Sequence, residues 1–243
     1  MARMLPDAEC WMEDEVVIGI TGWNLSAFNN AIPLDEAHLS AETLDHLSSV
    51  FARTELPFSI LVFSHEPVPV CDSVLKEHGY EVLFTDPVLA CEGPLKVPAR
   101  NAAVDIQPVT SDEDHRHFRE VVTTAFDMPP TFSAEMFDAL LRIPLNRPML
   151  AWLEGNPVGA GMLIYSEGVA AIFNVATLEP WRRQGIGTEM MLALHARALQ
   201  DGYVGTVLAA LPEGQALYAR LGYDQQGYQI SYSPADYVQR FSS

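Results

Sequence analysis

The chain has 243 residues, of which 49% are hydrophobic, which is ample for one large packed domain or two smaller ones. Its net charge is −18: residues 1–100 carry 5 basic and 16 acidic side chains, and residues 101–243 carry 9 and 16. Because nucleic-acid binding needs a basic surface, this balance argues against a nucleic-acid partner. The charge could attract a cationic amine substrate, or it could serve solubility alone.

Targeting signals and cysteine pairs are also missing from the sequence. No apolar run approaches the about 18–20 residues of a membrane-spanning helix, and the N-terminus lacks the basic and then apolar pattern of a signal peptide. We therefore expect a cytoplasmic protein that does not bind membranes. The three cysteines, Cys10, Cys71 and Cys91, are an odd number without metal-ligand spacing, so we expect reduced thiols and no bound metal.

The first hundred residues read as a small α/β segment. Acidic residues 1–16 are interpreted as an acidic lead-in or a short helix. Leu44, Leu47, Val50 and Phe51 recur at helical spacing, which predicts a helix over residues 40–52 that begins near Ser40. The remaining elements predicted here are strands at 16–20 and 58–63 and a helix at 70–78 that ends at Gly79.

Residues 70–91 repeat in outline the pattern of residues 212–233. Each has a short helix, a Gly-Tyr pair and an alternating strand; when Gly79 is aligned on Gly222, Leu75 falls where Tyr218 stands. Two prolines and a glycine within residues 92–100 favour a linker. These patterns predict two domains, residues 1–95 and 96–243, of which the first is an incomplete relative of the second. The alternative is that such helix-glycine-strand units recur by chance.

The second part has a more regular pattern. Thr110 or Ser111, followed by three acidic residues, is typical of a helix start, and Glu154-Gly155-Asn156 is typical of a hairpin turn. The predicted elements are strands at 104–109, 149–153, 157–165, 169–178 and 204–211, and helices at 111–126, 133–142 and 185–201. This order predicts a mixed sheet flanked by helices.

The joint between the 169–178 strand and the following helix is the strongest candidate for chemistry. Gly185 and Gly187 remove side chains where the backbone turns, so that several N–H groups can point the same way at the start of a helix. Such a concavity binds anions, above all phosphate. The glycine order excludes the Rossmann fingerprint, and the absence of a following Lys-Ser or Lys-Thr excludes a Walker loop.

The run Arg182-Arg183-Gln184-Gly185-Ile186-Gly187 resembles the pyrophosphate-binding loop of the GNAT superfamily of acetyl-CoA-dependent acetyltransferases. The resemblance extends to Tyr218-Ala219-Arg220-Leu221-Gly222-Tyr223 and to the element order β-α-α-β-β-β-α-β-α-β. It implies a GNAT-type, mostly antiparallel sheet over residues 96–243, preceded by a smaller, degenerate GNAT-like domain over residues 1–95. A single short glycine pattern could also be an ordinary tight turn.

The same resemblance implies how acetyl-CoA would be held. The backbone N–H groups from Arg183 to Thr188 would bind the pyrophosphate, with Arg182 and Arg183 adding charge at its edge. The pantetheine arm would pair with the main chain of Val175 and Thr177. The implied cofactor-binding residues are Val175, Thr177, Arg182, Arg183, Gln184, Gly185, Ile186, Gly187 and Thr188.

Two proton transfers accompany acetyl transfer to an amine, from the ammonium (pKa about 10.4) and to the leaving thiolate. Tyr218 stands where the family's tyrosine stands and is the candidate general acid; the alternative is a half-buried aromatic that anchors its helix. The base stays open between Glu167, Asn174, Asp127 and a chain of water molecules. Leu211 departs from the family pattern, which commonly has Asn or Ser there in contact with the cofactor.

Two functions follow from these residues. The first is an N-acetyltransferase that transfers acetyl from acetyl-CoA to a primary amine of a small molecule or peptide by direct attack in a ternary complex. The second is a non-catalytic acyl-CoA-binding or regulatory protein on the same scaffold. The acceptor pocket would be built from residues 126–147, alone or together with the N-terminal part, and Phe126, Met128, Phe132 and Phe137 suggest an apolar lining or a core. The oligomeric state stays open, a homodimer being one alternative.

Overall fold

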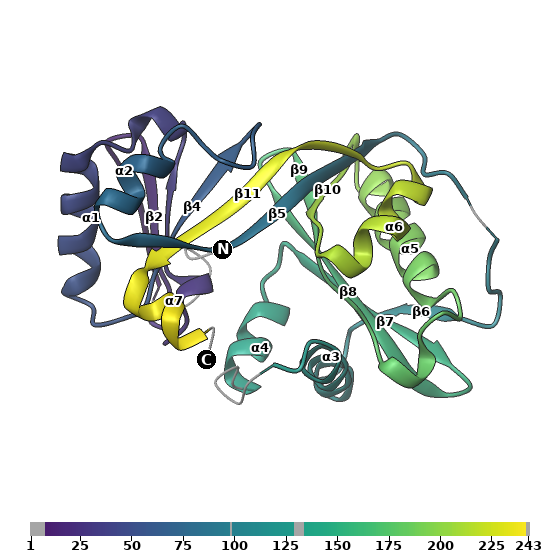
Figure 1. Cartoon of the computed structure of the whole chain (residues 1–243). Coiled ribbons are helices and arrows are strands. Elements are labelled where there is room, and N and C mark those ends of the chain that lie inside the picture. Colours follow the sequence, from purple (N-terminus) through teal and green to yellow (C-terminus); the bar gives the residue numbers. More distant parts are fainter. Residues whose placement is uncertain (1–7, 98, 129–133, 242–243) are drawn as a thin grey trace. The chain divides into compact units, whose positions relative to one another are not determined.

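The computed structural model describes residues 8–97, 99–128 and 134–241 (Figure 1). The chain forms two compact units: unit 1 contains the described residues up to Val88 and those from Gln226 onward, and unit 2 contains Leu89–Gln225. These bounds differ from the division predicted at residues 95/96. The C-terminal strand β11 (Asp224–Pro234) pairs with β4 (Ser59–Ser64), with Ile230 opposite Val62, so this strand from the end of the chain belongs to the sheet of the first unit.

Unit 1 contains a sheet with the strand order β1-β2-β3-β4-β11-β5. Its other strands are β1 (Glu9–Glu13), β2 (Val16–Ile20), β3 (Asn30–Pro33) and β5 (Tyr80–Glu92). The expectation of a short acidic helix is wrong for Glu9–Glu13, which pair antiparallel with β2. Asp14 and Glu15 have φ of 47° and 61°, the positive values that a two-residue hairpin turn requires. Pairing within this hairpin therefore makes Glu9–Glu13 a strand, although their acidic composition suggested a helix.

Two helices cover the core of unit 1. Helix α1 (Ala41–Ala52) confirms the prediction: the Ser40 side chain accepts a hydrogen bond from the Thr43 N–H. Helix α2 (Asp72–Glu77) is followed by Gly79, whose φ is +82°. The shorter segments are η2 (Ser26–Phe28), η3 (Glu36–His38) and α7 (Ala235–Phe241). The core lies between the helices and the sheet and contains Ile18, Leu44, Leu47, Phe51, Ile60, Val62, Leu75, Ile230 and Tyr232.

Unit 2 contains the strand order β5-β10-β9-β8-β7-β6. Its strands are β6 (Asp105–Pro108), β7 (Asn146–Leu153), β8 (Asn156–Ser166), β9 (Val169–Thr177) and β10 (Gly205–Ala209). The strands β6 to β9 are antiparallel, and β10 pairs parallel with β9. The predicted hairpin turn at Glu154 and Gly155 is confirmed, since both residues have positive φ. The mixed, mostly antiparallel sheet flanked by helices is therefore confirmed.

Helices pack on both faces of this sheet (Figure 1). Helices α3 (Asp112–Ala125) and α4 (Ala134–Leu141) share one core with Leu150 and Met162, whereas α5 (Ile186–Gln200) and α6 (Pro212–Leu221) share another with Leu163 and Ile172. The short η4 (Glu179–Trp181) lies between β9 and α5. Ser111 and Asp114 form a capping box that starts α3. None of the helices in the described ranges is long and apolar enough to cross a membrane.

Small residues on β8 determine how closely α5 lies on the sheet. A Cβ added at Gly159 would meet Ile186 at 2.7 Å, and one added at Gly161 would meet Leu194 at 2.8 Å and Met190 at 2.9 Å. The backbones of helix and strand therefore approach more closely than side chains would allow. This contact holds the first turn of α5 against the end of the sheet where β9 ends.

Candidate functional site

A β-bulge interrupts β9 beside the candidate site. Ala160 of β8 lies opposite Ala176 and Met162 lies opposite Phe173, so Asn174 and Val175 together face one residue of β8. Asn174 has a φ of 55°, as an extra residue in a strand often requires. Within the described residues, the ladder between β9 and β10 contains the pair Ala171 and Val207, which lies before the bulge. The Val175–Thr177 segment therefore lies beyond this pair with β10, while Ala176 and Thr177 still pair with Ala160 and Gly159 of β8.

The N-terminus of α5 leaves its first N–H groups without helical partners. Gly185 is the N-cap with a left-handed φ of 84°, and no side chain of a described residue caps the helix. The first intrahelical bond runs from the Glu189 N–H to the Gly185 carbonyl, so the N–H groups of Ile186, Gly187 and Thr188 are free of helical acceptors. These groups and the helix dipole together suit an anion.

The two predicted arginines have different environments. Arg182 Nε donates to the Thr177 carbonyl at 3.2 Å and its Nη2 donates to the Ala125 carbonyl at 3.4 Å, so this side chain joins the ends of β9 and α3. Arg183 is exposed and has a φ of 67°. Arg183 is therefore the freer of the two to follow a ligand, while Arg182 supports the shape of the loop.

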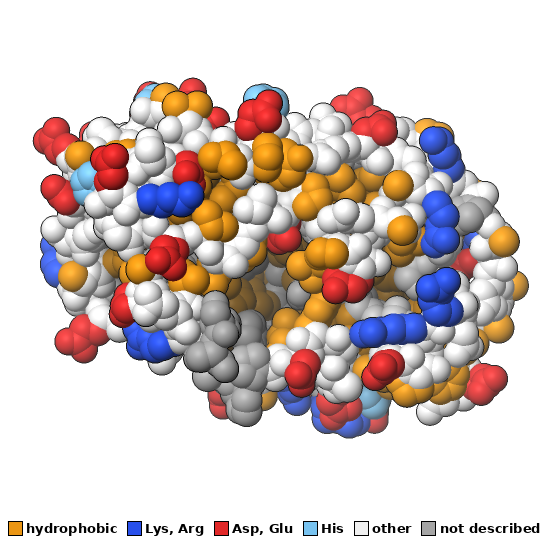
Figure 2. Space-filling model, viewed as in Figure 1, with side chains coloured by type: hydrophobic (Ala, Val, Ile, Leu, Met, Phe, Trp, Pro, Cys, Tyr) orange, Lys and Arg blue, Asp and Glu red, His pale blue; other side chains and the backbone are white. Residues whose placement is uncertain are grey.

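The sequence interpretation missed a linker contact to this loop. Glu189, in the first turn of α5, is 3% exposed and pairs with Arg100, whose Nη2 lies 2.6 Å from Oε2. Asn101 donates from its N–H to Glu189 at 2.9 Å and from Nδ2 to the Gln184 carbonyl at 2.8 Å. A glutamate within the apolar stripe of α5 was the available signal. Figure 2 shows several Lys and Arg side chains on the right of this face, where α5 lies in Figure 1.

Tyr218 lies on α6, and its ring packs against the first turn of its own helix. A Cβ at Gly214 would lie 2.6 Å from its Cε2 and 3.1 Å from its hydroxyl oxygen. The residue is 8% exposed, and burial raises the pKa of the Tyr218 hydroxyl to about 12. No hydrogen bond of this hydroxyl is found among the described residues, so the group is protonated at neutral pH and available as a donor.

Leu211, the departure from the family pattern, lies at the N-cap of α6. Its side chain is 46% exposed, and Pro212 follows as the first helical residue. Since leucine cannot accept a hydrogen bond, it offers no cap to this helix. The N-terminus of α6 is therefore uncapped by side chains of the described residues.

The three candidate bases lie at separate places. Glu167 is in the turn before β9, at the opposite end of this strand from Thr177. Asn174 lies in the bulge next to Val175, and Asp127 is exposed and lies two residues after Ala125, which Arg182 contacts. The fold thus brings Asn174 and the Asp127 segment toward the candidate site, whereas Glu167 lies far along the strand.

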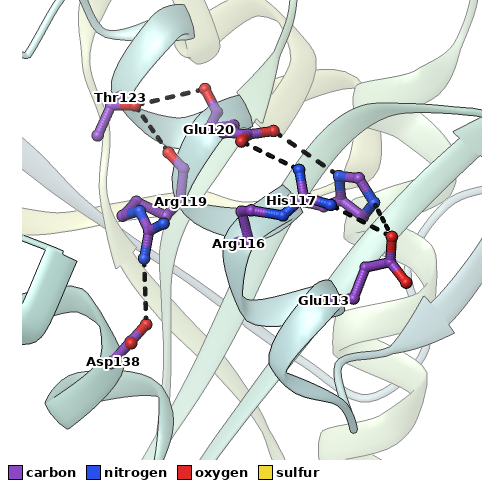
Figure 3. A network of polar contacts seen from close by, with 7 residues as sticks. All are labelled: Glu113, Arg116, His117, Arg119, Glu120, Thr123 and Asp138. Atoms are coloured by element: carbon purple, nitrogen blue, oxygen red, sulfur yellow. Dashed lines mark hydrogen bonds and ion pairs between the residues drawn. The ribbon is translucent and has the colours of Figure 1, made fainter.

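An ion pair joins α3 to α4, and α4 belongs to the segment 126–147 that is expected to build the acceptor pocket. Arg119 donates to Asp138 at 3.3 Å, and Figure 3 shows this pair beside a second network in which Glu113 and Glu120 flank Arg116 and His117. Phe137 is buried in the core between α3 and the sheet, and Met128 packs against the same core. Phe126 is 37% exposed. Phe132 lies outside the described residues.

Both ring nitrogens of His195, the buried histidine of α5, lie within hydrogen-bond distance of other protein groups. His195 Nδ1 lies 2.8 Å from Thr206 Oγ1, and its Nε2 lies 2.6 Å from the Gly93 carbonyl oxygen. The hydroxyl of Tyr223 lies 2.5 Å from the same Thr206 oxygen. This network joins α5 and β10 to the residue that precedes β11 and to the residue that follows β5. Cys10, Cys71 and Cys91 are free thiols.

Comparisons with known proteins bear on the fold and on the family of residues 116–223. Residues 116–223 match the Acetyltransferase (GNAT) family. A GCN5-related N-acetyltransferase from Kribbella flavida is 22% identical, with a TM-score of 0.74 over 93% of this chain and 89% of that chain. One from Sphaerobacter thermophilus is 16% identical, with a TM-score of 0.64 over 92% and 81%.

A third solved structure, a tandem GNAT protein from the clavulanic acid biosynthesis pathway, is 13% identical, with a TM-score of 0.60 over 90% of this chain and 77% of that chain. A search of curated protein sequences found no match. At these identities the structural likenesses establish the fold, whereas the family match rests on the sequence of residues 116–223. The chain therefore has the GNAT fold and carries, over residues 116–223, a domain that belongs to the GNAT acetyltransferase family.

Proposed function

We propose that the protein is an N-acetyltransferase that transfers acetyl from acetyl-CoA to a primary amine of a small molecule or peptide, by direct attack in a ternary complex. The observation that carries the proposal is the uncapped N-terminus of α5 beside the bulged, partly unpaired end of β9. One feature supplies N–H groups for a diphosphate, and the other supplies main-chain groups for an amide-containing arm. Acetyl-CoA has both chemical parts and supplies the acetyl thioester.

The proposed binding roles follow from these positions. The N–H groups of Gly185 to Thr188 bind phosphate oxygens, and the exposed Arg183 adds charge at their edge. Val175 and Thr177 bind the arm through main-chain groups, as an added strand would bind. Arg182 and Gln184 hold the shape of the loop through their contacts to Thr177 and Asn101.

Tyr218 is the proposed general acid. Its Oη holds its proton well above neutral pH because burial raises its pKa to about 12, and it has no partner among the described residues that would compete for this proton. A donor of this kind protonates a leaving thiolate without first losing another hydrogen bond. Loss of the ammonium proton of the amine falls to Asp127 or to ordered water, since Glu167 lies at the far end of β9 and the amide of Asn174 accepts a hydrogen bond but not a proton.

One observation favours the alternative, a non-catalytic acyl-CoA-binding or regulatory protein. Leu211 places an exposed apolar side chain at the N-cap of α6, where the resembling family commonly has a polar cofactor contact. The two functions share a binding site and differ in turnover.

The GNAT-like nature of the first part of the chain, and its division from the second at residues 95/96, remain proposals. Gly79 and Gly222, with φ of +82° and +97°, each end a short helix and precede a long strand. A helix-glycine-strand unit thus recurs in space as well as in sequence. The likeness to a tandem GNAT protein over 90% of this chain supports the same proposal.

The first test is calorimetric titration of the full chain with acetyl-CoA. We expect dissociation constants in the micromolar range and loss of binding in Gly187→Trp, because even a Cβ at this position lies 3.2 Å from Leu217 and a bulky group would obstruct the first turn of α5. Gln200→Trp, which places the same bulk on the exposed last turn of α5, is the matched control and should bind normally.

Thiol release in the presence of a panel of amines then separates the two functions. Release that depends on one class of amine supports the transferase, whereas tight binding without release for any amine favours the regulatory alternative. A wild-type chain that binds no acetyl-CoA would overturn both.

A further inference from the structure

The linker residue Arg100 pairs with a carboxylate in the first turn of α5, the helix whose N-terminus is proposed to bind phosphate. Glu189 is 3% exposed and belongs to the first turn of α5, next to the free N–H groups of Ile186 to Thr188. A negative charge there favours the helix N-terminus but repels a phosphate ligand at the same place. Arg100 Nε lies 2.9 Å and 2.8 Å from the two carboxylate oxygens, and Nη2 lies 2.6 Å from one of them.

The two side chains of this ion pair differ in their exposure to solvent. The Arg100 side chain is 60% exposed, whereas the Glu189 side chain is 3% exposed. The hydrogen bonds to Glu189 raise the pKa of the Arg100 guanidinium. A buried carboxylate without its arginine would keep an uncompensated charge, because burial limits the screening of this charge by water and salt.

Asn101 supports the loop from the same side. Its N–H donates to Glu189, its Nδ2 donates to the Gln184 carbonyl, and its Oδ1 accepts from the Ala103 N–H at 3.1 Å. The nitrogen and the oxygen of the amide each have a partner, so its orientation is determined. The Gln184 carbonyl is thereby bonded to the linker, and a Cβ at Gly185 would lie 3.3 Å from Asn101 Cβ. The linker therefore fits closely against the turn that precedes α5.

We propose that Arg100 and Asn101 are positioning residues for the anion-binding loop: Arg100 cancels the charge of Glu189, and Asn101 holds the Gln184 carbonyl against the linker so that the following N–H groups stay available to a diphosphate. This inference rests on the proposed function. It assigns to residues 100–101 a share in the affinity for the diphosphate part of the donor, but none in the binding of its acyl arm.

The experiment compares two acetyl donors, acetyl-CoA and S-acetylpantetheine, which lacks the diphosphate. Titrations of the full chain use the wild type, Arg100→Gln, Glu189→Gln, the double variant R100Q/E189Q and Asn101→Ala. Arg116→Gln is the control, because it removes an exposed arginine from two carboxylates on α3. Melting temperatures accompany each titration, so that loss of folding is separated from loss of binding.

We expect Arg100→Gln to weaken acetyl-CoA binding about tenfold, the effect of one poorly screened like charge, more strongly at low than at high salt. The double variant should return to within about threefold of the wild type, and Glu189→Gln alone should bind at least as tightly. Asn101→Ala should weaken binding by about threefold. Binding of S-acetylpantetheine should be unchanged in every variant.

Three results would overturn the inference: an unchanged affinity of Arg100→Gln, a double variant as weak as this single one, or equal losses for both donors. If Arg100→Gln does not fold, Glu189→Gln decides, because weaker acetyl-CoA binding in that variant contradicts the charge argument. If the wild type binds acetyl-CoA and the variants match it, the positioning role alone fails. If the wild type binds no acetyl-CoA, the proposed function fails and the positioning role fails with it.

Discussion

At the scale of single residues, two tyrosines of unit 2 have similar burial and different partners. Tyr218 and Tyr223 are 8% and 4% exposed, and their rings lie 6.0 Å apart. The Tyr223 hydroxyl is bonded to Thr206, whereas no hydrogen bond of the Tyr218 hydroxyl is found in the described part of the chain. The Tyr218 hydroxyl is therefore free to donate to a ligand, whereas that of Tyr223 is held within the protein.

Tyr218→Phe tests this role. The ring and its packing against Gly214 remain, so we expect an unfolding temperature close to that of the wild type and unchanged acetyl-CoA binding. Removal of the proton donor should lower kcat by about 100-fold, the usual range for general acid catalysis. Steady-state thiol release and calorimetry measure the two quantities.

Tyr223→Phe is the matched control. It removes a hydroxyl that is bonded to Thr206 beside His195, so it should lower the stability of the protein by about 1 kcal/mol and change kcat little. An unchanged kcat in Tyr218→Phe would remove Tyr218 from the mechanism.

At the scale of elements, close backbone approaches decide where α5 and β5 lie in unit 2. A Cβ at Gly161 of β8 would meet the ends of the flexible Met190 and Leu194 side chains at 2.8 to 3.0 Å. A Cβ at Gly205 of β10 would lie 2.0 Å from the Cys91 carbonyl oxygen and 2.8 Å from the Glu92 Cα. Side chains can move aside at the first position, but strand backbone must move at the second.

Substitution of alanine at these two positions should therefore give different losses. We expect Gly161→Ala to lower the free energy of unfolding by about 1 kcal/mol and Gly205→Ala by about 3 kcal/mol or more. The second loss is larger because the backbone of β5 cannot move away from an added methyl group without disturbing the sheet. Urea unfolding of both variants measures the difference. Equal losses would show that β5 adjusts as readily as a methionine side chain.

At the scale of the whole molecule, ionisation above neutral pH works against the fold. The net charge is already −18, and burial raises the pKa values of Tyr165, Tyr218, Tyr223 and Tyr232. Attraction of a cationic amine and solubility stay alternative roles of this net charge. Each further negative charge adds to the repulsion within the chain.

These shifts predict alkaline unfolding with a defined sign. The folded-state pKa of Tyr218, about 12, lies above the unfolded value of about 10, so its stabilising contribution is complete below pH about 10 and is lost as the pH rises toward 12. The free energy of unfolding should fall by about 1 kcal/mol per pH unit for each such tyrosine above pH 10. Urea titrations at several pH values measure the slope.

Tyr218→Phe provides the internal control for this prediction. The variant lacks one of the buried phenols, so its stability should fall less steeply above pH 10 and should have the same pH dependence as the wild type between pH 6 and 8. A parallel decline of both proteins above pH 10 would show that Tyr218 does not titrate on unfolding.

Local patterns in the sequence determined most of the elements and the position of the loop. The spacing of Leu44, Leu47 and Val50 predicted α1, the acidic residues after Ser111 predicted the start of α3, and the glycines at 185 and 187 predicted the turn into α5. Each of these signals lies within a few residues of the structure that it specifies, because helix periods, caps and turns depend on neighbouring residues.

Only the tertiary structure decided three features: the pairing of β11 with β4, the bulge at Asn174, and the contact of Arg100 and Asn101 with Glu189. Pairing with β2 likewise decided that Glu9–Glu13 form a strand and not the helix that their acidic composition suggested. Strand partners and ion pairs join residues that are distant in the chain. The local sequence around one partner does not indicate which residue is the other. Their geometry is determined by the packing of the whole sheet, which no short segment of the sequence encodes.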